Sequence, residues 1–490
     1  MDHDFLNTPN HRGNKKKLFL QLFIIFIIDD AMSLTEKVSK RAKKNYLNII
    51  LFIISIFIVV AAGTDVNNHF IIDIAGDIIV VSTCYLLLYL FIYHFRHEIM
   101  DVSRKIFFLL AAILAFVLLT RFAITLPQKD IVFLIPFALI PIVISTFYDA
   151  RLALFVLLIT LLLAGFMVPE PFEFIFISMM AGIVAILSLS DINRRYKLLF
   201  SSMVVTITYI VIYIALELRG AGSSGSMTLP EIKWFIGNGI LILSGYPLIS
   251  VFEKKFYFLS DSTMLELSDS SHPLQRRLSE EAPGSYQHSL QVANLAEAAS
   301  RAIDANVLLA RTGSLYHDIG KIISPLNFIE NQPPDSSPHT NLDPAESSRL
   351  IISHVDDGVM LARKYKLPVQ IIDFIRTHHG TTKTYFFYKK YLELHNNARG
   401  MEKDFIYSGP KPFTRELAIV MMADAVEAAS RTLENHSEDS ISELVERIVM
   451  IQEQEDQFSD APLTFRDISE IKAVFRKRLS NIYHSRIVYP

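Results

Sequence analysis

The chain has 490 residues, 51% of them hydrophobic, and its mean hydropathy is +0.33. A soluble protein of this length rarely averages so apolar, so membrane-spanning segments are expected. The net charge of −3 excludes a global basic field, and long nucleic acid is therefore not an expected partner. The single cysteine, Cys84, cannot form an intramolecular disulfide and is interpreted as a small buried hydrophobe.

Residues 1–45 are expected to form a cytoplasmic N-terminal segment. Its apolar run 18–28 is too short to cross a bilayer and follows the basic patch Lys15–Lys17. No small-residue cleavage site follows this run, which disfavours a signal peptide. An interfacial segment, or an over-extended start with Met32 as the second possible start, is favoured over a further span.

Eight apolar runs of about the length that crosses a bilayer follow in residues 46–251. Their approximate limits are 46–62, 71–93, 106–126, 131–148, 152–168, 172–190, 198–217 and 232–251. Lys and Arg gather at alternate ends of the runs, at Lys37, Lys40, Arg41, Lys43, Lys44, Arg96, Arg104, Lys105, Arg194, Arg195, Lys197, Lys254 and Lys255. Because positively charged loops stay in the cytoplasm, this alternation predicts a polytopic helical bundle with both termini cytoplasmic.

Few ionisable residues lie within these runs. Asp73 and Asp77 stand near the start of the second run, and Arg121 stands near the end of the third. A transporter or proton pathway normally carries more charged groups inside the membrane. The membrane half is therefore predicted to anchor or to sense rather than to transport.

From Phe252 onward the sequence becomes charged and amphipathic. Residues 252–281 are expected to form a helical linker with a break between Ser268 and Pro273. Residues 282–490 are expected to form a second domain, with helices at 289–303, 307–319, 345–365, 368–376, 385–397, 415–433, 440–451 and 465–483. No alternating strand pattern and no Gly-rich phosphate loop stands out, so the fold class is predicted to be all-α.

Seven potential metal ligands stand in this second domain: His288, His317, Asp318, His354, His378, His379 and Asp424. His288 and Asp424 extend apolar helix stripes, where a carboxylate is costly unless a cation or hydrogen bonds compensate it. Each residue alone has a structural alternative, such as a hydrogen-bonded core histidine or a helix cap. Together they are too many for one structural zinc and suit two hydrolytic metals that share a carboxylate.

The two adjacent ligand pairs carry a further expectation. Neighbouring helical residues point about 100° apart, so a pair converges on one centre most easily at a helix end. Gly320 and Gly380 closely follow the two pairs and are expected to supply these ends.

These residues carry a resemblance to a known family. The segment Tyr316–Lys321, YHDIGK, resembles the HDIGK signature of HD-domain phosphohydrolases, and His288 and Asp424 match the first and last parts of its H…HD…D pattern. Further matching stretches are 281–284, 328–332, 351–355, 377–382 and 409–412. With the membrane half, they make the chain from about residue 45 onward similar to bacterial seven-transmembrane receptors with an intracellular HD hydrolase, the PgpH-type cyclic di-AMP phosphodiesterase family. Members usually carry a large extracellular domain where this chain has only the connection 64–70.

The resemblance implies a multi-pass enzyme of the bacterial plasma membrane whose cytoplasmic domain hydrolyses cyclic di-AMP to linear pApA. It implies two divalent transition-metal ions, for which the mixed ligand set suits Mn or Fe at least as well as Zn. Asp318 is expected to bridge the ions. His288, His317 and Asp424 would complete one site, while His354, His378 and His379 would serve the other. His379 could instead contact phosphate, and Lys321 is expected to neutralise phosphate charge.

Several alternatives stay open. Cyclic di-GMP relatives carry a GYP tripeptide after the histidine pair, whereas residues 380–383 here read GTTK, which counts against that substrate. The aromatic residues that could stack on bases, or fill the core instead, are Tyr286, Tyr316, Tyr385, Phe386, Phe387 and Tyr388. Other candidate functions are hydrolysis of (p)ppGpp or another nucleotide, and non-catalytic nucleotide binding, which a complete ligand set disfavours. A homo-oligomer is compatible with the sequence.

Overall fold

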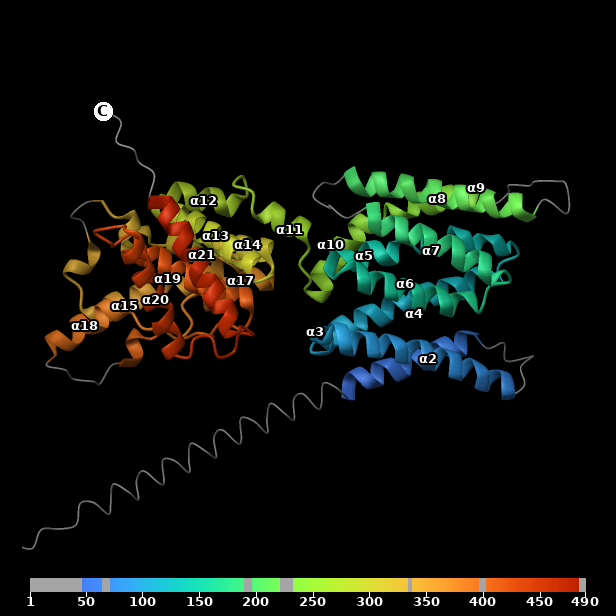
Figure 1. Cartoon of the computed structure of the whole chain (residues 1–490), viewed down its shortest axis with the longest axis horizontal. Helices are drawn as coiled ribbons and strands as arrows, with labels where there is room; N and C mark the ends of the chain where they lie inside the picture. Colours follow the sequence, from blue (N-terminus) through green and yellow to red (C-terminus); the bar gives the residue numbers. More distant parts are fainter. Residues whose placement is uncertain are drawn as a thin grey trace, which may run out of the picture. The chain divides into compact units, whose positions relative to one another are not determined.

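The computed structural model describes residues 46–63, 71–188, 196–220, 232–333, 337–395 and 402–483. Within these ranges the chain is helical, and its only extended pairing is an isolated bridge between Lys383 and Ile406 (Figure 1). The all-α prediction is confirmed. The chain divides into two compact units at Phe256 and Tyr257. The predicted segment 1–45 and the connection 64–70 lie outside the described residues.

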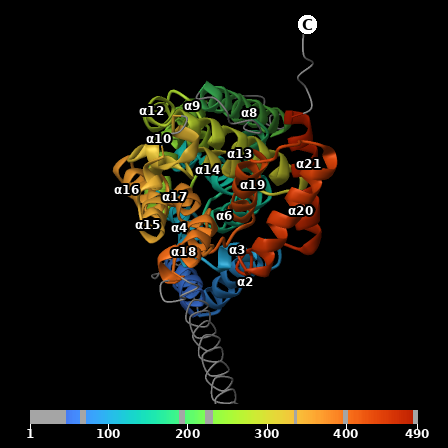
Figure 2. The ribbon, with the colours of Figure 1, turned by 90° about the vertical axis from the view of Figure 1, so that its left-hand side faces the viewer.

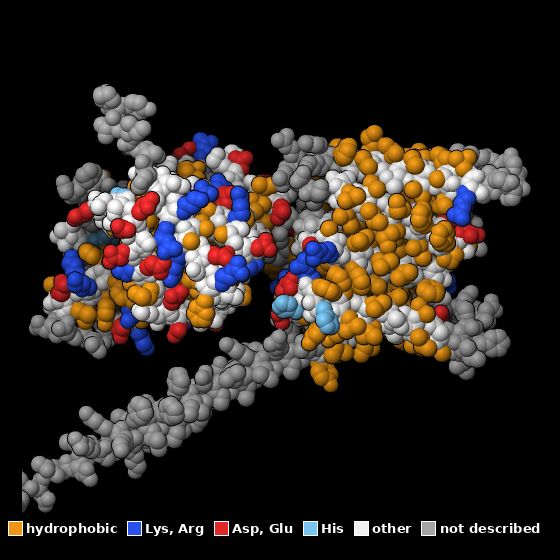
Figure 3. All heavy atoms as spheres, in the orientation of Figure 1, with side chains coloured by type: hydrophobic (Ala, Val, Ile, Leu, Met, Phe, Trp, Pro, Cys, Tyr) orange, Lys and Arg blue, Asp and Glu red, His pale blue; other side chains and the backbone are white. Residues whose placement is uncertain are grey.

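The first unit consists of apolar helices. They are Tyr46–Gly63, α2 (Ile71–Phe95), α4 (Ser103–Thr125), α5 (Leu139–Phe147), α6 (Ala150–Gly165), α7 (Pro171–Ser188), α8 (Tyr196–Gly220), α9 (Ile232–Ile242) and α10 (Gly245–Phe256), with short α3 (His97–Met100) and the 3-10 segment η1 (Lys129–Leu134). Many large apolar side chains stay exposed, among them Phe57, Phe122 and Met203. Figure 3 shows hydrophobic side chains covering this unit's visible face, which is typical of helices that cross a membrane.

The spanning capacity of these helices is uneven. Among the described residues, six segments are long and apolar enough to cross a membrane, or seven if α9 and α10, which meet at a bend of 41°, count as one span. The helix α6, with 16 residues, is shorter. The predicted span 131–148 is not one continuous α-helix, because η1 and α5 are separated around Pro136, which lacks a backbone donor. The count of eight spans stays a prediction.

One buried side chain compensates this interruption. The amide nitrogen of Asn238 on α9 donates to the carbonyls of Phe133 and Ile135, at 2.9 Å in each case. A carbonyl without a partner in apolar surroundings costs several kcal/mol. Asn238 therefore holds the irregular backbone after η1 against α9. Cys84 is buried, as predicted.

The second unit is built from short helices and 3-10 turns. The helices are α11 (Asp261–Leu267), α12 (Pro273–Glu281), α13 (Pro283–Ala302), α14 (Val307–Tyr316), α15 (Pro344–Ile352), α16 (His354–Lys364), α17 (Val369–Thr377), α18 (Tyr385–Leu394), α19 (Arg415–Ser430), α20 (Glu438–Gln454) and α21 (Phe465–Tyr483). The 3-10 turns are η2 (Ile319–Ile322), η3 (Pro325–Asn327), η4 (Ile329–Asn331), η5 (Pro338–Thr340) and η6 (Glu402–Phe405).

The core of this unit forms where α13 packs beside α19 (Figure 2). The apolar stripe of α13 includes Val292, Leu295 and Ala299 and meets buried residues of α19, α20 and α21. The surface, in contrast to that of the first unit, mixes charges of both signs (Figure 3). This packing places the polar end of the α13 stripe, at His288, against α19.

Several helix boundaries predicted from the sequence are wrong, and three of these differences lie near the candidate site. The helix expected at 289–303 already begins at Pro283, because proline is well suited to the first helical position. The helix expected at 307–319 ends at Tyr316, before the first ligand pair. The helix expected at 345–365 is broken at Ser353 into α15 and α16. The last two differences put His317 and His354 at helix ends rather than inside helices.

Candidate metal centre

Three predicted histidines stand where helices end or begin. His317 follows α14, His354 opens α16 and His378 follows α17. Each ring places Nδ1 against the backbone carbonyl three residues earlier, at 2.6 Å for His317, 2.6 Å for His354 and 2.9 Å for His378. Carbonyls in the last turn of a helix lack intrahelical donors and can only accept, so Nδ1 carries a proton in each ring. Nε2 is the nitrogen left to face the centre.

Asp318 lies between two sets of histidines. Its Oδ2 is 3.3 Å from His317 Nε2 and 3.7 Å from His288 Nε2. Its Oδ1 is 3.5 Å from His354 Nε2 and 3.6 Å from His378 Nε2. One carboxylate oxygen therefore faces each set.

The seven predicted ligands come together in two groups. His288, His317 and Asp424 form one group, and His354, His378 and His379 form the other. Within each group the possible ligand atoms all lie within 4.8 Å of one another. Their side chains come from α13, α16 and α19 and from the residues just after α14 and α17. The fold thus gathers the whole predicted set around Asp318.

The donor set fits divalent cations. Among the described residues, no donor meets hydrogen-bond geometry toward either oxygen of Asp318 or toward Nε2 of His317, although all three atoms are buried. A buried carboxylate in this condition is unfavourable unless a cation compensates it. Lys321 supplies part of this compensation, because its Nζ lies 2.8 Å from Asp318 Oδ2. Asp318 Oδ1 and the ring nitrogens of both groups can still accept further positive charge.

The charge state of the metal-free site differs between the groups. Burial lowers the pKa of His317, but the neighbouring Asp318 and Asp424 outweigh burial and raise it to about 10. Burial also lowers the pKa of His354, and Asp318 compensates only in part, so that pKa falls to about 3. Burial opposes ionisation of Asp318 and Asp424, yet the cations beside them hold both pKa values well below the usual range. A cation entering the first group must therefore displace a proton from His317.

Two glycines shape the surroundings of the ligand pairs. Gly380 adopts φ +51° after His379, which is the left-handed helix end predicted from the sequence. Gly320 does not act in this way. A Cβ on Gly320 would lie 1.8 Å from the His354 carbonyl oxygen, so glycine is needed for the close contact of η2 with α16. That contact holds Asp318 beside His354.

Lys321 is engaged rather than solvated. Besides Asp318, its Nζ contacts Glu330 Oε1 at 2.8 Å, and Ser285 Oγ donates to the same oxygen at 2.8 Å. Burial lowers the pKa of Lys321, but the two carboxylates outweigh this effect and raise it. Lys321 thus balances the charge of Asp318. Its contact with substrate phosphate stays a prediction.

A cleft of about 860 Å³ opens beside the centre, a size suited to a small ligand. Ligands from both groups line it, together with Lys321, Glu330 and Arg431. Its apolar and aromatic lining comprises Ile329, Tyr385, Met421, Ala425, Ala428, Ile448 and Ile451. Of the six aromatic residues proposed to stack on bases, Tyr385 alone lines this cleft.

Two of the other aromatic candidates pack against neighbouring side chains or backbone, whereas Phe386 is 73% exposed. Tyr316 is fully buried, and its hydroxyl donates to the Leu267 carbonyl at 2.7 Å. Tyr388 packs on Phe405 with ring centroids 5.3 Å apart. Tyr316 is therefore a core residue, which was the alternative interpretation, and Tyr388 is partly buried against a small core cluster.

Sequence reasoning gave no role to three residues near the centre. The Glu427 carboxylate meets His288 Nδ1, and Arg431 pairs with Glu427. The ring of Tyr407 lies over His379, with centroids 4.2 Å apart. The spacing of Glu427 from Asp424, three residues along one helix, is a signal that could have found it. No local signal distinguishes Tyr407, which arrives from a separate segment.

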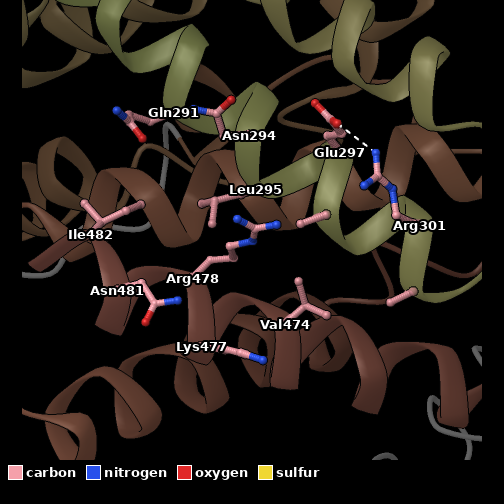
Figure 4. A pocket seen from close by; sticks show the side chains of 12 residues that line it. Gln291, Asn294, Leu295, Glu297, Arg301, Val474, Lys477, Arg478, Asn481 and Ile482 are labelled. Atoms are coloured by element: carbon pink, nitrogen blue, oxygen red, sulfur yellow. Dashed lines mark hydrogen bonds and ion pairs between the residues drawn. The ribbon is translucent and has the colours of Figure 1, made fainter. Parts of the chain in front are cut away.

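A second groove lies between α13 and α21 (Figure 4). It is lined by polar residues such as Gln291 and Asn294 and by the basic residues Arg301, Lys477 and Arg478. It contains none of the seven predicted ligands, so the metal chemistry belongs to the other cleft.

Both halves of the chain resemble known proteins. The chain matches the family described as a 7TM receptor with intracellular HD hydrolase over residues 71–260, and the HD domain over residues 285–429. Family models thus match both halves of the chain, and the predicted resemblance to the seven-transmembrane receptors with an intracellular HD hydrolase is confirmed.

Its relatives are more specific. The chain is 34% identical over 441 residues to the cyclic-di-AMP phosphodiesterase PgpH of Bacillus subtilis (strain 168), covering 86% of this chain and 61% of the relative. It is 37% identical over 314 residues to PgpH of Listeria monocytogenes, covering 64% and 44%. The chain thus spans less than two thirds of these relatives. A solved L. monocytogenes PgpH HD domain in complex with cyclic-di-AMP is 41% identical and covers 44% of this chain and 100% of that one, with a TM-score of 0.42.

The raised pKa of His317 predicts pH-dependent metal binding. For the metal-free full-length chain in detergent, the apparent affinity for Mn²⁺ should rise between pH 6.5 and 8.5, by about tenfold per pH unit for each displaced proton. Titration calorimetry in buffers of different ionisation enthalpy measures both the affinity and the released protons. An affinity independent of pH, without proton release, would contradict the protonated state of His317.

Proposed function

We propose that this chain is a membrane-anchored, metal-dependent phosphodiesterase that hydrolyses cyclic di-AMP to linear pApA. The carrying observation is the buried Asp318 carboxylate, whose two oxygens face separate groups of ligands. The two relatives named as cyclic-di-AMP phosphodiesterases support the substrate. The absence of a GYP tripeptide after His379 disfavours cyclic di-GMP.

Two divalent ions, Mn or Fe, would occupy the two groups. Asp318 would bridge them, with His288, His317 and Asp424 on one ion and His354, His378 and His379 on the other. When bound, such ions lower the pKa of a water molecule and polarise phosphoryl oxygens. Mixed imidazole and carboxylate donors suit Mn and Fe at least as well as Zn.

Other residues near the centre would contact the phosphates and bases of the substrate. Lys321 keeps a fixed positive charge beside Asp318, where a phosphate would approach. Ile329, Met421 and Tyr385 offer apolar and aromatic surface on which flat bases can rest. The reaction adds water across one phosphorus–oxygen bond, leaving a 5′-phosphate on the linear product and a free ribose 3′-hydroxyl. The second phosphodiester of the substrate would stay intact in linear pApA.

The substrate prediction is tested by turnover. The full-length chain, loaded with Mn²⁺ or Fe²⁺, should convert cyclic di-AMP to pApA and cleave cyclic di-GMP far more slowly. Both substrates share the sugar-phosphate ring, so discrimination must come from contacts with the purine edge. Rates with cyclic di-AMP, cyclic di-GMP and ppGpp are compared side by side. A preference for ppGpp, or equal rates on the two cyclic dinucleotides, would favour a different nucleotide phosphohydrolase.

The bridging role of Asp318 is tested by elemental analysis. The purified chain should hold about two transition-metal ions. Asp318→Ala should lose both ions and lower activity by more than about a hundredfold, because even residues behind metal ligands cost 10- to 100-fold. His354→Ala should mainly weaken one ion. Asp356→Ala is the matched control, an exposed acid on the same helix as His354. Full metal retention in Asp318→Ala refutes the bridge.

We also propose that both termini and the second unit are cytoplasmic. The family-matched residues 71–260 hold the apolar segments α2, α4, η1 with α5, α6, α7, α8 and α9 with α10, and the helix Tyr46–Gly63 precedes them. These add up to an even number of crossings if each segment spans. Basic residues at the end of α10 support a cytoplasmic exit.

Reporter fusions test this orientation. A fusion after Tyr257 should report the cytoplasm, and a fusion at Ser224 should report the outside, because an odd number of crossings separates Ser224 from the N-terminus. Cytosolic fluorescence and external phosphatase activity are the two readouts. External activity from the Tyr257 fusion would refute the orientation.

A further inference from the structure

His288 is oriented differently from the other histidines of the centre. It lies inside α13, in the second turn, where backbone carbonyls already accept hydrogen bonds from the helix. Its Nδ1 therefore meets a side chain, the Oε2 atom of Glu427 on α19. His317, His354 and His378 use free carbonyls at helix ends instead.

Glu427 is itself held in place. Its second oxygen, Oε1, accepts from Arg431 one turn later, at 2.8 Å from Nε and 2.7 Å from Nη2. The side chains of His288 and Glu427 are each 6% exposed. Both carboxylate oxygens thus have defined partners, and the pair is shielded from water.

One face of α19 grips both nitrogens of the His288 ring. Asp424 Oδ1 lies 2.9 Å from Nε2, and Glu427, three residues further along, meets Nδ1. Residues three apart on a helix share a face. The orientation of the His288 ring is therefore set by two side chains of α19.

We infer that Glu427 is a positioning residue for the group His288, His317 and Asp424, and that it sets the affinity of this group for its ion. A carboxylate behind a ligating imidazole fixes the tautomer and ring orientation and strengthens the donor nitrogen. The inference rests on the proposed metal-dependent function. Because Glu427 contacts no member of the second group in any described interaction, the other ion is affected little.

The competing explanation is an ordinary helix ion pair. Glu427 and Arg431 have the i, i+4 spacing that stabilises many helices. Glu297 and Arg301 on α13 have the same spacing, with 3.0 Å between their charged atoms, and they lie in the groove away from the metal centre (Figure 4). A purely structural role predicts that the two glutamates behave alike. A positioning role predicts that only Glu427 affects metal binding.

The test compares the full-length chain in detergent with Glu427→Gln, Glu427→Leu and the control Glu297→Gln. Calorimetric titration of each metal-free protein with Mn²⁺ should show two ions in the unmodified chain. Glu427→Leu should weaken one ion by about 10- to 100-fold and leave the other within about twofold. Glu427→Gln keeps an acceptor oxygen and the side-chain volume, so its affinity for the weakened ion should lie between those of the unmodified chain and Glu427→Leu. Glu297→Gln should leave both affinities unchanged.

Two further readouts keep the outcome clear if Glu427→Leu folds poorly. The Mn²⁺-induced rise in unfolding temperature should shrink in Glu427→Gln, whereas a structural role would lower the metal-free temperature and leave that rise intact. At substoichiometric Mn²⁺, the electron paramagnetic resonance spectrum of the Glu427 variants should show a larger share of isolated ions and a smaller share of coupled ion pairs than the spectrum of the unmodified chain. Two unchanged affinities in both Glu427 variants overturn the positioning role alone. An unmodified chain that binds one ion or none overturns the proposed function and this inference with it.

Discussion

The second unit is organised around one unfavourable group, the buried carboxylate of Asp318, which is 1% exposed. A lone carboxylate in such surroundings would be unstable in its charged form. Lys321 and the rings on both sides of Asp318 hold it ionised. The helix ends at His317 and His378, the break before His354 and the close contact at Gly320 all serve to bring these groups to it. Because the buried carboxylate is stabilised by positive charge, its surroundings form a candidate site for cations.

The orienting acceptors divide the centre in two. Backbone carbonyls hold the rings of His317, His354 and His378, and such acceptors depend only on where a helix stops. His288 depends on Glu427, a side chain that substitution can change. Within one centre, the first group therefore carries a carboxylate-supported ring, and the second does not. Unequal affinities for two otherwise similar ions are a natural consequence.

The membrane half also contains buried polar groups, and there an amide side chain satisfies some of them. Its interrupted span leaves carbonyls at membrane depth, and the Asn238 amide satisfies two of them. Among the residues that the structure describes, both candidate metal groups lie in the second unit. An anchoring or sensing role for the membrane half agrees with this division. The candidate metal centre and the apolar helices thus belong to separate parts of one chain.

The sequence by itself determined the helical class and the apolar segments and singled out seven candidate ligands, because hydrophobic periodicity and residue type are local properties. The HDIGK segment also indicated the family. Only the tertiary structure decided which ligand faces which oxygen of Asp318, since His288 and Asp424 are 136 positions apart and meet through the packing of α13 on α19. Tyr407 escaped prediction for the same reason, because it reaches His379 from a separate segment. The three-residue spacing of Glu427 from Asp424 is visible in the sequence, but the contact of Glu427 with His288 forms only when α13 and α19 pack.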